Sequence, residues 1–190
     1  ELVTIETDAG RVEEDEGIRR DTTLERLSEL DPVFTGSGTV TAGNASQISD
    51  GAAATLVTSR AFAEDHGLDV LAEVGTNNVA GVDPTVMGIG PVPATRGLLD
   101  RADRDVDDYD LVELNEAFAS QTLYCRQELG IDPDRFNVNG GAIAIGHPLG
   151  ASGTRLPVTL LPEMQKRDAE RGLATLCVGF GQGAAIEFVR

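Results

Sequence analysis

The stretch NVNGGAIAIGHPLGASGTR, residues 137–155, is the part of the chain around which the rest is organised. Five of its glycines surround a single histidine, His147, and Pro148 restricts the backbone directly after it. Glycine is used where the backbone turns tightly or another surface approaches closely. An imidazole in such a loop can exchange protons near neutral pH. Taken alone, the stretch fits a turn-rich loop as well as a catalytic one, so other parts of the chain must decide.

Composition bounds the class of protein. The chain has 190 residues, 41% of them hydrophobic, with 22 glycines and few aromatic residues, which is typical of one sizeable α/β unit. It contains no apolar run long enough for a membrane helix and no signal peptide. Because it begins at Glu1, inside a predicted strand, we expect a fragment of a longer protein.

The net charge of the chain limits the classes of partner that it can bind. The formal net charge is −17, and Lys166 is the only lysine. This balance argues against nucleic acids and anionic membranes as partners. An acid-rich, lysine-poor surface is typical of a halophilic protein, because concentrated salt screens self-repulsion; an ordinary acidic protein is the alternative. Cys125 and Cys177 provide neither a disulfide framework nor a metal-binding spacing, so we expect a reducing, cytoplasmic compartment and no metal.

Strand and helix patterns alternate along most of the chain. We interpret residues 1–36 as the tail of a loop subdomain with a short helix at 22–30, and residues 37–190 as the main domain. The main domain is predicted to hold a strand from Thr39 and further strands at 70–75, 111–114, 174–178 and 184–189. Helices are predicted from Asp50 to Gly67, at 94–102, up to Gly130 and at 152–170. This order predicts an α/β fold with a mixed, mostly parallel five-stranded sheet, helices on both faces and an antiparallel closing pair.

Two prolines are awkward in the last predicted helix, because each removes a helical hydrogen bond. Pro157 is tolerated if it lies in the first turn. Pro162 should kink the helix or delay its start.

Three groups far apart in the sequence each follow a predicted strand: Asn115, His147 and Cys177. Asn115 comes after strand 111–114, where open α/β sheets bind ligands. Cys177 lies at the end of strand 174–178 and precedes Gly179, whose amide can point at a ligand. Each has an ordinary alternative: a buried cysteine is often a small hydrophobe, and Glu116 beside Asn115 suits either acid–base chemistry or a helix dipole.

Other site types fit less well. The pattern GFGQGA at 179–184 resembles the start of a dinucleotide fingerprint, but too few residues follow for its helix and second strand. Ser152 with His147 would make a hydrolase pair, yet GASG is not a nucleophile elbow. Two histidines and two cysteines far apart do not favour a metal site.

Taken together, three motifs make the sequence recognisable. NEAFA at 115–119, GGAIAIGHPLGASGTR at 140–155 and CVGFGQG at 177–183 resemble the signature stretches of the carboxyl-terminal half of thiolases. Residues 38–54 and 87–94 are similar to further thiolase segments. The resemblance covers nearly the whole chain from Asp15 onward, and it implies a thiolase-like C-terminal domain preceded by the tail of the loop subdomain that binds coenzyme A.

The resemblance implies acyl transfer between coenzyme A thioesters, with coenzyme A as substrate and no permanently bound cofactor. In that family, the residue matching His147 activates a nucleophilic cysteine of the amino-terminal half and binds the thioester oxygen. The residue matching Asn115 holds a water in the same oxyanion hole. The residue matching Cys177 removes or returns the α-proton, and the amide matching Gly179 helps form a second oxyanion hole. Residue types suit these tasks, since an enolate needs donors in place and a positioned base.

The same resemblance implies a coenzyme A site, formed by Arg19, Phe34, Ala42, Ser46, Ala117 and Phe118. The arginine fork suits phosphate or adenine. The partners it implies are the missing amino-terminal half and further copies of the chain in a homodimer or homotetramer.

Departures from the family pattern also matter. Thiolases often have GGG where this chain has Gly179, Phe180 and Gly181, so the loop is expected to be less pliable or differently packed. The acyl-carrying cysteine is missing, and Cys125 cannot replace it because it lies mid-helix. As given, the chain should lack turnover.

Alternatives remain open at this point. A ketoacyl synthase relative is disfavoured, because that group has histidine or asparagine in place of Cys177. A non-catalytic module that binds coenzyme A or acyl groups, or pairs with another subunit, stays possible. Residues 15–27 resemble the degradative branch of the family and residues 140–153 the biosynthetic one, so neither direction nor acyl length is fixed.

Overall fold

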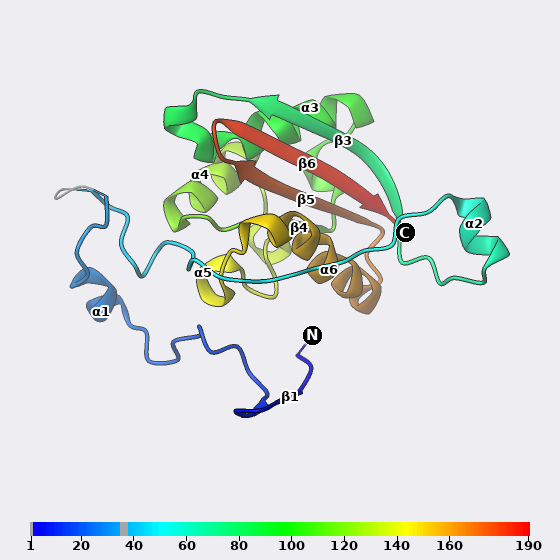
Figure 1. Cartoon of the computed structure of the whole chain (residues 1–190). Helices are drawn as coiled ribbons and strands as arrows, with labels where there is room; N and C mark the ends of the chain where they lie inside the picture. Colours follow the sequence, from blue (N-terminus) through cyan, green and yellow to red (C-terminus); the bar gives the residue numbers. More distant parts are fainter. Residues whose placement is uncertain (1, 35–37) are drawn as a thin grey trace.

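A four-stranded mixed sheet holds the carboxyl-terminal part of the chain together. The computed structural model of the chain describes residues 2–34 and 38–190. Strands β3 (Glu73–Gly81), β4 (Leu111–Leu114), β5 (Arg171–Val178) and β6 (Gln182–Val189) pair in the order β3-β6-β5-β4 (Figure 1). Only β4 and β5 are parallel, while β6 is antiparallel to both of its neighbours. The α/β class, the mixed sheet and the antiparallel closing pair are therefore confirmed, but a mostly parallel sheet of five strands is wrong for the described residues.

The two strands that were mispredicted lie at the start of the main domain. Around Thr41 and Ala45 the chain forms only isolated bridges, to Pro32 and Phe118, in place of a strand. The edge strand β3 begins later than predicted and runs antiparallel along the whole of β6. The strand contains Asn77 and Asn78. Because asparagine is depleted in strands, the sequence pattern did not predict a strand at these positions. In the fold, Asn78 is buried and its Nδ2 donates to the Ala94 oxygen at 3.1 Å.

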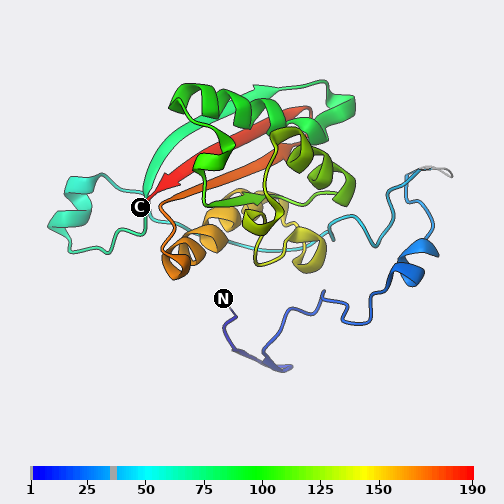
Figure 2. The same cartoon turned by 180° about the vertical axis from the view of Figure 1, so that it is seen from behind.

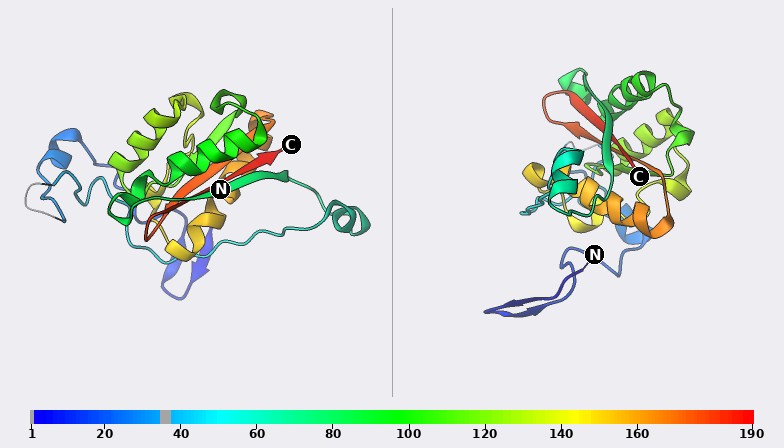
Figure 3. Two further views of the ribbon diagram at one scale, coloured as in Figure 1. Left: turned by 90° about the horizontal axis from the view of Figure 1, so that it is seen from above. Right: turned by 90° about the vertical axis from the view of Figure 1, so that its right-hand side faces the viewer.

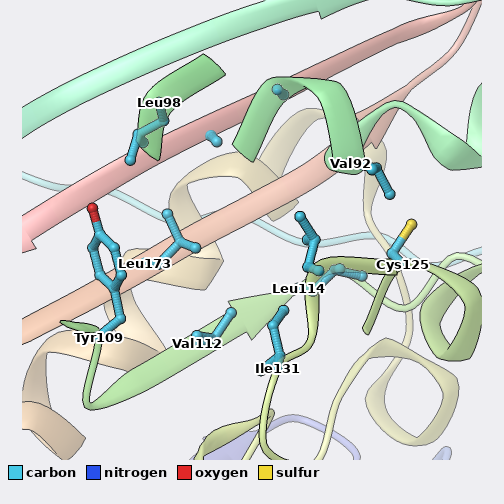
Figure 4. Packing of buried hydrophobic residues seen from close by; sticks show 11 residues of the cluster. Val92, Leu98, Tyr109, Val112, Leu114, Cys125, Ile131 and Leu173 are labelled. Carbon is cyan, nitrogen blue, oxygen red and sulfur yellow. The ribbon is translucent and has the colours of Figure 1, made fainter. Parts of the chain in front are cut away.

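Helices cover both faces of the sheet (Figure 2). Helices α3 (Pro91–Ala102) and α4 (Ala119–Leu129) pack on one face, and α6 (Leu149–Arg167) packs on the other. Successive strand residues point to opposite faces, so in β5 Leu173 joins the first core and Ala174 the second. Figure 4 shows the first core, in which side chains from α3, α4 and the sheet meet around Leu114 and Leu173.

Short turns connect these elements. They are the 3₁₀ helices η1 (Pro84–Ile89), η2 (Val106–Asp108) and η3 (Pro133–Arg135), and the single-turn helix α5 (Ala142–Ile145). Helix α3 begins at Pro91, before the predicted start at Ala94. Helix α4 ends as predicted, with Gly130 at φ 70°, a left-handed cap that glycine adopts readily.

Both prolines lie inside one continuous helix. Because α6 starts at Leu149, Pro157 lies well beyond the first turn, and Pro162 does not delay the start. Each proline removes a hydrogen bond to the carbonyl four residues earlier. These carbonyls belong to Gly153 and Val158, which are exposed, so water can satisfy them.

The amino-terminal part has almost no core of its own. We call residues 2–67, as far as they are described, the arm, and residues 68–190 the body. The arm holds the hairpin β1 (Ile5–Thr7) and β2 (Gly10–Val12), helix α1 (Leu24–Ser28) and helix α2 (Arg60–Asp65). The hairpin projects away from the body (Figure 3). The predicted boundary between residues 36 and 37 falls outside the described residues.

The helix expected between Asp50 and Gly67 is mostly absent. Its last turn forms as α2, capped by Ser59 in place of Asp50 and followed by Gly67 at φ 61°. Residues 47–59 have no regular secondary structure and are largely exposed. The β-branched residues in TLVTS disfavour a helix, and a short helix needs a packed face to be stable.

None of the helices in the described ranges has the length and apolar content needed to cross a bilayer.

Candidate active site

Two predicted site residues follow the parallel strands β4 and β5. Asn115 directly follows β4, and its backbone N–H donates to the Thr175 oxygen of β5 at 3.0 Å. Cys177 lies near the end of β5. The carboxyl ends of parallel strands meet at one edge of a sheet. The structure therefore brings these two residues to the same edge.

The side-chain amide of Asn115 makes no hydrogen bond within the described residues. It is fully buried, and within the described residues neither Oδ1 nor Nδ2 has a hydrogen-bond partner. A buried amide without partners costs free energy, and such exceptions mark functional groups or unseen water. The fixed carboxamide can therefore hold a water or a ligand atom.

The Cys177 side chain lies in an environment that favours the neutral thiol. It is 6% exposed, and burial raises its pKa, which the hydrogen bond at its own backbone only partly offsets. Just beyond it, a side chain added at Gly179 would meet open space. The thiol is therefore protonated at neutral pH, and the Gly179 backbone borders free volume close to it.

Glu116 holds the loop that leads to His147. Its carboxylate accepts hydrogen bonds at 3.2 Å from the Asn137 Nδ2 and from the Ile143 backbone N–H, and it occupies the space where Gly141 would carry a side chain. Because α4 starts only at Ala119, Glu116 is not a partner of that helix's first turn. Both carboxylate oxygens accept hydrogen bonds from the loop. Glu116 therefore positions the loop and does not transfer protons.

His147 lies at the start of α6. Its backbone N–H donates to the Gln47 oxygen at 3.2 Å, and its Nδ1 is 2.6 Å from the Ser152 Oγ. Burial lowers the pKa of His147, and the positive charge of Arg155 lowers it further. At neutral pH the ring is therefore neutral and able to act as a base.

The arm forms one wall of the site. Ser46 N–H donates to the Ala117 oxygen at 2.9 Å, while the next residue, Gln47, accepts from His147. The stretch after β4 and the histidine loop are therefore joined side by side through two neighbouring arm residues. His147 and Leu149 line a cavity of about 360 Å³ with residues 46–49. Residues of both the arm and the body therefore line the cavity beside His147.

Four of the predicted coenzyme A residues meet where the arm contacts the body, and the other two are exposed on the arm. Phe34 and Phe118 meet edge to face with their ring centroids 6.0 Å apart, and Ser46 and Ala117 are hydrogen-bonded neighbours. Phe118 also borders a second cavity of about 340 Å³, lined otherwise by residues 85–89, 120, 121 and 124. Ala42 is exposed in the same loop as Ser46. Arg19 is exposed on the arm, two residues beyond Gly17, whose oxygen accepts from the Gln47 Nε2 at 3.1 Å.

The described residues contain no group of three or more His, Cys, Asp or Glu side chains placed to hold a metal ion.

Comparisons with known proteins agree with this geometry. Residues 68–190 match the family model "Thiolase, C-terminal domain", and residues 1–61 match "Thiolase, N-terminal domain". The chain belongs to the thiolase family. The family resemblance and the thiolase-like fold are therefore confirmed, and the carboxyl-terminal model covers the body while the amino-terminal model covers most of the arm.

Curated relatives include an acetyl-CoA acetyltransferase of Pseudomonas aeruginosa, 57% identical over 93% of this chain and 45% of the relative. A peroxisomal 3-ketoacyl-CoA thiolase of Arabidopsis thaliana is 53% identical over 93% of this chain and 38% of the relative. Among solved structures, human mitochondrial 3-ketoacyl-CoA thiolase in complex with CoA has a TM-score of 0.89 and 42% identity, covering 98% of this chain and 47% of that one. The chain thus spans less than half the length of these thiolases.

The loop after Cys177 departs from the usual thiolase glycines at a position that favours glycine. Phe180 has φ 65° and is 93% exposed. This left-handed backbone is unfavourable for a residue with a Cβ. Gly181 follows at φ 86° and packs directly against Val82. The loop keeps the backbone path that a glycine run permits, with a strained and exposed phenylalanine in the middle.

Sequence reasoning gave no supporting role to three residues that build this site, although it considered Ser152 with His147 as a hydrolase pair. The Asn137 side chain pairs with the backbone of β4 as a neighbouring strand would. Its Oδ1 accepts from the Leu114 N–H at 2.8 Å, and its Nδ2 donates to the Leu114 oxygen at 2.9 Å. Gln47 ties the arm to the histidine loop, and Ser152 contacts the imidazole. Only the position of Asn137 at the head of the glycine-rich stretch signalled a role; the other two depend on tertiary contacts.

Proposed function

We propose that this chain is the carboxyl-terminal half of a thiolase that transfers acyl groups between coenzyme A thioesters. The reaction converts a 3-ketoacyl-CoA and CoA into an acyl-CoA and acetyl-CoA, or runs in reverse to form acetoacetyl-CoA. The observation that supports the proposal is the buried, unpaired carboxamide of Asn115 directly after β4, beside the end of β5 that carries Cys177. Such fixed, unused hydrogen-bonding groups suit a developing oxyanion.

In the cleavage direction, the amino-terminal half supplies the nucleophilic cysteine. His147 takes the proton of that thiol, and the thiolate attacks the 3-keto carbon. The Gly179 amide, in the second oxyanion hole, stabilises the resulting oxyanion. When the bond between the α- and β-carbons breaks, the electron pair passes to the acetyl-CoA enolate, whose thioester oxygen is stabilised by His147 and the water held by Asn115. Cys177 gives its proton to the enolate carbon and regains one from the thiol of the incoming CoA, whose thiolate attacks the acyl-cysteine; the released cysteine takes back the proton held by His147.

The neutral state of Cys177 fits this order of events. Because burial raises its pKa, the group rests as a thiol and serves first as an acid. The neutral state of His147 fits as well, since a lowered pKa leaves the imidazole free to accept a proton. The two groups therefore rest in the states that cleavage requires at neutral pH.

Coenzyme A would lie along the arm. Phe34 and Phe118 form an apolar pair, and Ser46 and Ala117 bring the arm against the body beside them. Arg19 offers an exposed cation for the phosphates or adenine. Ala42 lies exposed on the loop between these groups. Assembly as a homodimer or homotetramer, a cytoplasmic location and a surface suited to concentrated salt stay predictions.

One observation favours a second candidate, a non-catalytic module that binds coenzyme A or pairs with another subunit. The only other cysteine, Cys125, is fully buried on α4, where its thiol donates to the Gly88 oxygen at 3.3 Å. Burial raises its pKa to about 11. This thiol is too inaccessible and too weakly acidic to carry an acyl group, so residues 2–34 and 38–190 would bind without turnover unless another segment supplies the nucleophile.

The experiment is thiolysis of acetoacetyl-CoA by the chain combined with a thiolase amino-terminal half. His147→Ala and Cys177→Ala should each lower kcat by orders of magnitude while the fold survives. His66→Ala and Cys125→Ala replace the other histidine and cysteine and serve as matched controls that keep most of the activity. Unchanged activity in Cys177→Ala would remove its proposed role. Coenzyme A binding by calorimetry without turnover in any combination would support the non-catalytic module.

A further inference from the structure

A buried hydroxyl contacts the catalytic candidate His147 and has no part in the mechanism above. Ser152 lies on α6, fully buried, with its Oγ 2.6 Å from the Nδ1 of His147. The same Oγ is 3.1 Å from the backbone oxygen of Pro148. The hydroxyl therefore has two acceptors within reach, the imidazole nitrogen and a carbonyl one turn back.

We propose that Ser152 is the positioning residue of His147, a rotatable hydroxyl that lets Nε2 act in turn as proton acceptor and as hydrogen-bond donor. The catalytic consequence rests on the proposed function, but the hydrogen-bond assignment itself does not.

The argument follows from the properties of a hydroxyl, which donates one hydrogen and accepts through two lone pairs. If Nδ1 carries a hydrogen, it donates to Ser152, and the hydroxyl turns its own hydrogen to the Pro148 oxygen. Nε2 is then free to accept the proton of a thiol. If Nδ1 carries none, the hydroxyl donates to it, and the hydrogen on Nε2 can bind a thioester oxygen. The charged ring, with hydrogens on both nitrogens, again donates to Ser152.

Other partners at this position would not allow both roles. A carboxylate only accepts, so it would keep a hydrogen on Nδ1 and favour the charged ring. A backbone carbonyl would likewise fix one tautomer. An alanine would leave the Nδ1 hydrogen of the charged ring buried and unpaired, which is costly. Serine is thus matched to a histidine that must both take a proton and donate a hydrogen bond.

Among the described residues that line the cavity beside His147, none carries a charge. The facing arm residues 46–49 are uncharged, and Leu149 is apolar. Arg155, on the next turn of α6, is the charged group that acts on His147. Its positive charge disfavours the charged ring, so the neutral tautomers decide how His147 behaves near pH 7.

An ordinary interpretation competes with this one. A serine in a helix often bonds to the carbonyl four residues earlier with no consequence beyond the helix. In that case the contact with His147 would be incidental, and removing the hydroxyl would alter stability but not the titration of the ring.

Nitrogen-15 NMR of the histidine-labelled chain separates the two interpretations. The chain has only two histidines, and His66 is an internal control, exposed on α2 with its Nδ1 2.9 Å from the Phe62 oxygen. In Ser152→Ala the pKa of His147 should fall by roughly one unit, because the charged ring loses the stronger hydrogen bond, and its Nδ1 signal should shift. Ser152→Thr, which keeps the hydroxyl, should restore both. His66 should not move in any variant.

Ser152→Cys, close to serine in size and a weak hydrogen-bond donor, replaces the alanine variant if that one unfolds, and it should show the same shift. An unmoved His147 titration and unmoved nitrogen signals in a folded Ser152→Ala or Ser152→Cys chain would overturn the proposal. In the assembled enzyme, Ser152→Ala should lower kcat at least tenfold with little change in KM, and should shift the acid limb of the kcat profile. If the enzyme shows no thiolysis at all, the proposed function fails while the NMR result still decides the role of Ser152.

Discussion

The arm and the body of this chain obey the same local rules but differ in what stabilises them. The body buries its large apolar side chains in two cores, one on each face of the sheet. In the described arm, Ala63 is the only buried hydrophobic residue, whereas several large side chains are mostly exposed, among them Leu24, Phe34, Ile48, Leu56 and Val57. Charge follows the same division: residues 1–67 have 14 acidic and five basic residues, a net charge of −9, whereas the 123 residues of the body have a net charge of −8.

The difference shows that local signals are not enough to make a stable unit. The arm has a hairpin and two short helices, which Thr23 and Ser59 cap at their amino-terminal ends. Short helices and isolated hairpins are marginal in water without a packed face. Yet residues 44–51 of the arm build a wall of the candidate site. The region with the least stabilisation of its own therefore helps to hold the groups proposed to bind coenzyme A.

The largest expected effect separates buried from exposed leucines. Leu173→Ala in the body should lower the free energy of unfolding by about 2–5 kcal/mol, because it leaves a cavity in a fully packed core. Leu56→Ala in the arm, where the side chain is 75% exposed, should change it by less than about 0.5 kcal/mol. Urea denaturation followed by circular dichroism measures both. Equal losses would show that the arm shares the cooperative unit of the body.

The body was largely predictable from sequence for the same reason that it is stable. Strand 111–114 and the glycine stop at Gly130 were found at their positions, because burial and capping act over a few residues. What failed depended on distant partners. Strand β3 owes its length to β6, and residues 47–59, which are largely exposed in the described structure, lack the packed face that would stabilise a helix. Helix α6 tolerates its prolines because the affected carbonyls face solvent.

The candidate site was predictable in its chemistry and less so in its framework. Asn115 and Cys177 stood out because polar groups at the ends of strands have few structural reasons to be there. His147 stood out because glycines surround it, although it follows the helical turn α5 and not a strand. The supports were harder to find: the sequence indicated the wrong roles for Glu116, and Asn137 and Gln47 act through contacts between segments far apart in sequence. Local patterns reveal the groups that do chemistry, whereas the residues that orient them require the fold.

A second contrast concerns ion pairs. In the body, Glu187 is 4% exposed; its Oε1 accepts from the Thr76 N–H and its Oε2 from the Tyr109 hydroxyl, both at 2.8 Å. Burial alone would raise its pKa, but these hydrogen bonds and the charge of Arg104 hold the pKa below its ordinary value. The arm pair of Arg20 and Glu14, at 2.7 Å, is exposed.

Because the folded pKa of Glu187 is lowered, its contribution is present above the unfolded pKa of about 4.3 and is lost as the pH falls through the folded value. Glu187→Gln should therefore cost about 1–3 kcal/mol at neutral pH and flatten the loss of stability in acid. Glu14→Gln should change stability by less than about 0.5 kcal/mol at any pH. Denaturation curves from neutral to acidic pH measure both; identical acid dependence in wild type and Glu187→Gln would contradict this role.

Salt should act on the two regions differently. Raising ionic strength from about 0.01 M to about 1 M shortens the screening length from about 30 Å to about 3 Å. Self-repulsion is densest in the arm, so its dimensions by small-angle scattering should contract most, and the melting temperature of the body should rise more modestly. The same titration with a non-ionic osmolyte is the control. A flat response to salt in both measurements would rule out a surface adapted to concentrated salt.

The smallest expected effect lies in the loop after Cys177. A residue with a Cβ in the left-handed region loses about 1 kcal/mol, and asparagine is tolerated there better than phenylalanine. Phe180→Asn should therefore raise the free energy of unfolding by about 0.5–1 kcal/mol, since the exposed ring loses little on removal. Phe34→Asn, an exposed phenylalanine of the arm, should leave the unfolding of the body unchanged. If Phe180→Asn instead destabilises the chain, the ring makes contacts that outweigh the backbone strain. The loop would then be held by its side chain, and the glycine run typical of thiolases would not be its natural replacement.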